Sequence, residues 1–150
     1  MKTLLVGLSA LVAIAWGFDI LNAASPADVH PLWAARQEAL YLSGLLSIAM
    51  MSLAMLLATR PMWLEAPLGG MDRIYLTHKW AGILAVSFAA AHWLIEMSSD
   101  ILKATIGRAG RVPKENLSSI LDAMRDLGKD MGEWAIYALL AMLAITLWKK

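Results

Sequence analysis

Two of the three histidines in this 150-residue chain, His78 and His92, lie in one mostly apolar segment that runs from Tyr75 to Glu96. Near neutral pH an imidazole can exchange a proton or bind a metal ion through a ring nitrogen. In a helix, a separation of fourteen residues places two side chains about 21 Å apart along the axis and within about 40° of each other around it. The two rings therefore cannot share one metal ion, which argues against a metal transporter.

Small residues line the helix face between the two histidines. Gly82, Ala85 and Ala89 fall on the same arc, so a flat molecule could lie close against it. A bilayer core is about 30 Å thick, and a spanning helix would hold one histidine in each half. Because imidazole is a common axial ligand of haem iron, the pattern suggests two stacked haems. The alternative is that the histidines hydrogen-bond to neighbouring helices while the small residues pack against another helix.

The composition is that of an integral membrane protein. Hydrophobic residues make up 59% of the chain and charged residues 17%, with a mean hydropathy of +0.59. Soluble domains carry about 25% charged residues. A net charge of +1 gives no field that would attract nucleic acid. The chain has no cysteine, which excludes disulfides, thiolate metal sites, iron–sulfur clusters and cysteine nucleophiles within it.

Four apolar segments are long enough to cross a bilayer, so we expect an all-α bundle of four transmembrane helices. These spans cover residues 3–24, 37–59, 75–97 and 131–148. A cleaved signal peptide is the alternative for the first segment, but its apolar run is long for one, and a retained span is favoured. In the second span, small residues are candidate helix contacts; they are Gly44, Ser47 and Ser52.

Three polar segments connect the spans. Residues 25–36 form an outer loop in which His30 is expected to be solvated rather than a ligand, and residues 60–73 form a short inner turn with two prolines and two glycines. Residues 98–130 form a polar outer segment. Within it, apolar residues recur at helical spacing after Asn116, which predicts an amphipathic helix. That helix is either a lid above the outer histidine or a connector along the interface.

The distribution of charge predicts that the N-terminus is cytoplasmic. Cations surround the inner turn and lie at both ends of a four-span chain, as the positive-inside rule requires; they are Lys2, Arg60, Arg73, Lys79, Lys149 and Lys150. Six of the seven tryptophans map near the interfaces, with Trp63, Trp80 and Trp148 inside and Trp33, Trp93 and Trp134 outside. We expect the protein in the inner (plasma) membrane of a bacterium, in contact with lipid.

The run from Arg60 to His92 resembles the ferric reductase-like transmembrane domain, which NADPH oxidases, ferric reductases and related bacterial flavocytochromes share. The resemblance depends on the inner turn followed by a histidine pair with thirteen residues between its members. The matching residues are Arg60, Trp63, Gly69, Gly70, Met71, Asp72, Arg73, Tyr75, His78, Gly82 and His92. They cover about thirty-five residues closely, and the order of spans fits the rest.

The resemblance implies that the third span supplies one axial ligand to each of two b-type haems. It makes His78 the ligand of the inner haem and His92 that of the outer haem, with Gly82 in the same haem-binding helix. Electrons from a cytoplasmic flavin would pass outward and reduce ferric iron or oxygen. Arg73 and the neighbouring cations of the turn would hold either the inner haem propionates or lipid phosphates.

The chain departs from that family in lacking the second pair of ligands. Neither the fourth span nor the tail contains a histidine, and no flavin-binding or G-x-G-x-x-G segment is present. We therefore expect a partner chain or a missing C-terminal region to supply the second axial ligands, and a further domain to bind FAD and NAD(P)H. The chain would then be part of an oxidoreductase that is not competent alone. The alternative is a non-redox membrane packing or interaction subunit without haem.

Overall fold

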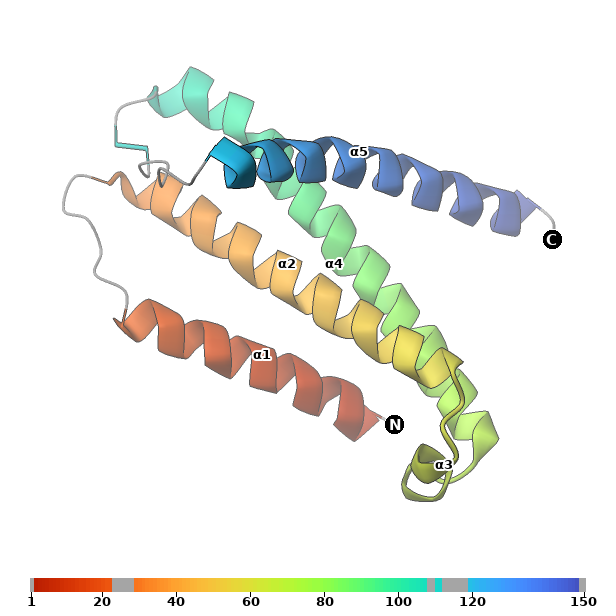
Figure 1. Ribbon diagram of the computed structural model, residues 1–150. Coiled ribbons are helices and arrows are strands. Elements are labelled where there is room, and N and C mark those ends of the chain that lie inside the picture. The colour runs from red at the N-terminus through yellow and green to blue at the C-terminus, as the bar shows by residue number, and fades with distance from the viewer. Residues whose placement is uncertain (1, 23–28, 108–109, 112–118, 149–150) are drawn as a thin grey trace. The chain divides into compact units, whose positions relative to one another are not determined.

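The computed structural model describes residues 2–22, 29–107, 110–111 and 119–148, and in these ranges all secondary structure is helical (Figure 1). The helices are α1 (Lys2–Asn22), α2 (Pro31–Ala58), α3 (Met62–Leu68), α4 (Met71–Ile106) and α5 (Ser119–Trp148). The chain divides into two compact units, Met1–Val112 and Pro113–Lys150. The first unit contains both histidines of the sequence pattern. The all-α prediction is confirmed for the described residues.

Three helices of the described part, α1, α2 and α4, are long and apolar enough to cross a membrane. The fourth predicted span lies within α5 and stays a prediction. The predicted amphipathic helix begins in residues 112–118, outside the described residues, and its later part also lies in α5. The structure has one continuous helix of 30 residues, α5, across the boundary expected at residue 130 between the polar outer segment and the fourth span. Helix α5 contains no proline, so nothing in its sequence interrupts the main-chain hydrogen bonds.

Helices α2 and α4 pack against each other along their lengths, and α1 packs on this pair (Figure 1). Their buried contact is formed by Met50 and Ala54 of α2 and Ala81 and Ala85 of α4, joined by Leu5 of α1. Each pair is spaced four residues apart, which puts its members on one face of the helix. Alanine has almost no side chain, so the two backbones can approach closely.

The hydroxyl group of Ser47 shows that the backbones of α2 and α4 lie close together. Ser47 of α2 is 8% exposed, and its Oγ donates a hydrogen bond of 3.2 Å to the main-chain oxygen of Ala85 in α4. A serine side chain is too short to reach another helix's backbone unless the helices are in direct contact. Ser47 is thus a helix contact, as predicted, whereas Ser52 is exposed.

The inner turn contains the short helix α3, and two glycines end it. Gly69 adopts the left-handed conformation (φ 83°) at the end of α3, and Gly70 (φ 102°) precedes α4. Only glycine takes up such positive φ values readily. A Cβ at Gly69 would also lie 3.1 Å from Cδ of Arg73. The turn therefore begins α4 at Met71 and places His78 two turns into the helix.

At the opposite end, α2 begins at Pro31, six residues before the predicted start of the span. Proline is favoured at the first helical position because it needs no main-chain N–H partner there. His30 caps the helix: its Nδ1 accepts from the N–H of Leu32 at 3.2 Å. The main-chain N–H of His30 donates to the oxygen of Gly110 at 2.9 Å, which ties α2 to the segment after α4. His30 thus has a capping role.

Two features at this end of the helix pair were not predicted from the sequence. Trp33, predicted near the outer interface, is only 2% exposed, and the guanidinium carbons of Arg36 and Arg111 lie 6.0 and 5.6 Å from its ring centroid. Helix α4 continues to Ile106 rather than ending near residue 97. Its 36 residues span about 54 Å, so it extends beyond a bilayer core of about 30 Å.

We expect Ala81→Leu to destabilise the α2–α4 contact, because Ala81 is completely buried between the two backbones. Overpacking of this kind costs about 1–3 kcal/mol. The control is Ala104→Leu, at an exposed position of the same helix. Thermal unfolding of the detergent-solubilised chain, followed by tryptophan fluorescence, should show a lower midpoint for the first variant alone. Equal midpoints for the two variants would contradict the packing described.

Candidate functional site

His78 and His92 both turn one ring nitrogen toward helix α2. Nδ1 of His78 lies 2.9 Å from the main-chain oxygen of Ala54, and Nδ1 of His92 lies 3.1 Å from that of Leu40. Both side chains are half-buried. The two histidines of α4 therefore face the same neighbouring helix, at two levels of the helix pair.

These contacts determine which ring nitrogen carries the proton. A carbonyl oxygen can only accept a hydrogen bond, so Nδ1 must be the donor in both rings. In a neutral imidazole the lone pair is then on Nε2. Metal-ligating histidines commonly have this arrangement, in which the N–H of one ring nitrogen donates to a carbonyl and the other nitrogen binds the metal. The donor set of α4 therefore fits axial ligation through Nε2.

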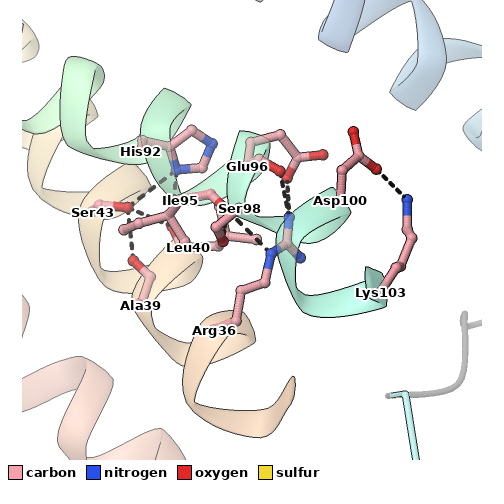
Figure 2. Close-up of polar contacts among 10 residues, drawn as sticks. All are labelled: Arg36, Ala39, Leu40, Ser43, His92, Ile95, Glu96, Ser98, Asp100 and Lys103. Carbon is pink, nitrogen blue, oxygen red and sulfur yellow. Dashed lines mark hydrogen bonds and ion pairs between the residues drawn. The ribbon is translucent and has the colours of Figure 1, made fainter. Parts of the chain in front are cut away.

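Among the described residues, Nε2 of neither ring has a hydrogen-bond partner, so each could bind a ligand from outside the helix pair. Figure 2 shows the second ring nitrogen of His92 on the side of the ring away from Leu40 and Ser43. Within the described ranges, the hydrogen bonds of His78 and His92 all involve Nδ1. In the same ranges, the side-chain nitrogen that is both buried and without a hydrogen-bond partner is Nε1 of Trp33. Because Nε2 of His78 and of His92 also lacks a partner, neither of these two atoms can be fully buried.

The small-residue strip between the histidines is divided between a covered and an open part. Ala85 is 3% exposed and contacts α2, so α2 occupies this position of the strip. Gly82 lies on the open side: a Cβ built on it would meet no other atom within 4 Å. The face available to a flat ligand therefore runs past Gly82, and Ala85 is not part of it.

The ring of His92 lies directly on the backbone of α2 at Gly44. A Cβ at this position would be 3.3 Å from Nδ1 and 3.4 Å from Cε1 of His92. Any larger residue would press on the ring. The small size of Gly44 indicated a helix contact in the sequence, and the structure shows that the contact is with the ring of His92.

One turn beyond His92, an ion pair between the buried Arg36 side chain and the more accessible Glu96 carboxylate connects the same two helices (Figure 2). Nε of Arg36 donates to the main-chain oxygen of Ile95 at 3.1 Å, and its Nη2 donates to the main-chain oxygen and the Oε2 of Glu96 at 2.9 and 3.1 Å. The Arg36 side chain is 9% exposed. A buried charge is stable only when it is paired and hydrogen-bonded, and three oxygens do this here. Arg36 was expected in a loop, and its role was missed.

Arg73 lies apart from the histidines. It is exposed in the first turn of α4, its side chain lies against Gly69, and it is about 140° around the helix from His78. No group of three histidine, cysteine, aspartate or glutamate side chains that could hold a metal ion occurs within the described residues. A metal bound by His78 or His92 would therefore need further ligands from elsewhere.

A comparison with known families gives a match over most of the chain. The family model described as "Ferric reductase like transmembrane component" matches residues 43–149, which include both histidines, the inner turn and most of α2. No curated protein and no solved structure matches the chain. The matched region covers more than half of the sequence. The chain therefore belongs to the family of ferric reductase-like transmembrane components.

Proposed function

We propose that the chain is the haem-binding part of a transmembrane electron-transfer protein. His78 supplies one axial ligand to an inner b-type haem, and His92 supplies one to an outer haem. The observation that carries this proposal is that α2 holds Nδ1 of both rings through main-chain oxygens, leaving Nε2 of each as the ligating atom. Bound haem supplies one-electron redox chemistry, by which electrons pass from the cytoplasmic side to ferric iron or oxygen outside.

The residues around the two histidines perform separate tasks in this proposal. Gly82 leaves the helix face open, so a macrocycle can approach the backbone between the two ligands. Arg73 and the cations of the inner turn bind acidic groups at the cytoplasmic side, either haem propionates or lipid phosphates. Arg36 and Glu96 fix the separation of α2 and α4 next to the outer ligand.

Each histidine provides half of a bis-histidine site. The second axial ligands come from another histidine-bearing helix, of a partner chain or of a further segment, and FAD and NAD(P)H bind to another domain. The membrane arrangement that we propose has residues 131–148 as a fourth span and the polar segment before it outside. It places the N-terminus in the cytoplasm and the protein in a bacterial inner membrane, as the positions of the cations favour.

A non-redox packing subunit is the second candidate, and one observation favours it. Both rings are hydrogen-bonded to a neighbouring helix, which by itself would satisfy a structural histidine. A purely structural ring in an apolar environment would be expected to pair its second nitrogen as well, because an unpaired polar atom is costly there. The availability of Nε2 in both rings and the open face at Gly82 therefore favour the haem-binding function.

Replacing each histidine by alanine tests the assignment of ligands. We expect His78→Ala to lose the inner haem and His92→Ala to lose the outer haem, because each removes one nitrogen donor. His30→Ala is the control, since His30 caps α2 at a distance from the open face. The measurement is the reduced-minus-oxidised spectrum of membranes from cells supplied with haem, with and without a co-expressed histidine-bearing partner. Absence of b-type bands under every condition, or loss of the same haem in both variants, would refute the proposal.

A bulky residue at Gly82 tests whether haem approaches the open face. Gly82→Leu meets no atom of the chain near its Cβ, so we expect an unchanged thermal midpoint but at least a tenfold loss of haem content, or about 1.4 kcal/mol of binding free energy. Gly7→Leu is the matched control, at a position of α1 where a built Cβ likewise meets no atom within 4 Å. Haem content per protein is measured after purification. Full haem content in the Gly82 variant would show that haem does not lie there.

A further inference from the structure

We propose that Ser43 of α2 is a positioning residue that strengthens His92 as an electron donor to iron and thereby lowers the reduction potential of the outer haem. The inference rests on the proposed function, because it assumes that His92 ligates haem through Nε2. It concerns the opposite ring nitrogen, Nδ1, whose partners the structure shows directly (Figure 2).

The N–H of His92 is shared by two acceptors. The main-chain oxygen of Leu40 lies 3.1 Å and Oγ of Ser43 lies 3.2 Å from Nδ1. The hydroxyl proton of Ser43 points away from His92, because Oγ donates a hydrogen bond to the main-chain oxygen of Ala39 at 2.7 Å. The main-chain oxygen of Leu40, at 3.2 Å, is a second and longer acceptor of the same hydroxyl. Oγ therefore presents a lone pair to Nδ1. Ser43 is 7% exposed, so little water competes for it.

His78, the inner histidine, also donates from Nδ1 to a main-chain oxygen of α2, but no hydroxyl group of the described residues accepts from it. Nδ1 of His78 donates to the main-chain oxygen of Ala54, and within the described residues this is its hydrogen-bond partner. Ser43 follows Leu40 by three positions in α2, and the residue three positions after Ala54 is Leu57. Leu57 is buried and apolar, so it offers no acceptor. In the hydrogen-bond acceptors of Nδ1, the two histidines therefore differ by one side-chain oxygen.

This difference has a definite electronic consequence. Hydrogen-bond acceptors on the N–H of a ligating imidazole make the ring more basic, which strengthens its bond to the metal. A more strongly donating axial ligand stabilises oxidised iron, so the reduction potential falls. Ser43 would make the outer site a stronger reductant than the same site without the hydroxyl. The outer site is the one that faces the terminal acceptor in the proposed function.

A redox titration of Ser43→Ala tests the effect on the outer haem. We expect the ratio of reduced to oxidised outer haem at a fixed potential to rise by about two- to tenfold, which corresponds to the free energy of one hydrogen bond. The inner haem should titrate as in the wild type. Ser47→Ala is the matched control: Ser47 is a buried serine one turn along α2, and its hydroxyl donates to Ala85. Ser43→Thr keeps the hydroxyl and should restore the wild-type titration. An outer haem that titrates identically in the Ser43→Ala and Ser47→Ala variants would overturn the inference.

A second measurement does not require haem. In the full chain labelled with ¹⁵N-histidine in lipid nanodiscs, His92 should show a protonated Nδ1, and Ser43→Ala should shift this resonance without shifting that of His78. An unshifted His92 resonance, or a proton on Nε2, would overturn the role of Ser43 even where haem binds. If no b-type haem is found under any condition, the proposed function fails, and the shift of the Nδ1 resonance still decides whether Ser43 acts on His92.

Discussion

The hydrogen bond from an imidazole N–H of α4 to a main-chain oxygen of α2 is the interaction on which the site depends. In an apolar environment an unpaired ring N–H would cost several kcal/mol, roughly 2–7 by transfer measurements. The bonds at Ala54 and Leu40 satisfy that donor, orient each ring and determine that the lone pair is on the opposite nitrogen. The same kind of contact thus orients both rings of α4 toward α2.

These bonds require the two backbones to be unusually close, and the surrounding residues provide this closeness. Ala81 and Ala85 bring the helices together in the middle, and Gly44 lets the outer ring rest on the backbone of α2. The ends of the pair are held by different means. Arg36 binds three oxygens at the end near His92, and Gly69 and Gly70 determine where α4 begins at the other end. The orientation of the rings is therefore a property of the whole helix pair.

Much of this could be predicted from the sequence, because it depends on local patterns. The length of the apolar segments predicted a membrane protein, and the spacing of His78 and His92 predicted that the two side chains lie on one face of a helix. The remainder depends on contacts between distant segments. The partners of both rings are main-chain oxygens, which every residue possesses, so no residue type marks Leu40 or Ala54 as acceptors. The burial of Trp33 likewise involves Arg111, which lies far from it in the sequence.

Because the acceptors at positions 40 and 54 belong to the backbone, they cannot be removed by a change of side chain. Substitution at Leu40 would alter packing but leave the carbonyl in place, so ring orientation would tolerate considerable sequence drift along α2. The neighbouring positions 43 and 44 act on the ring of His92 through their residue types. Gly44 lets the ring lie against the backbone because it has no side chain, and Ser43 contacts Nδ1 with its hydroxyl group. Divergence within the lineage of this chain could therefore adjust the surroundings of His92 through two adjacent codons while those of His78 keep their geometry.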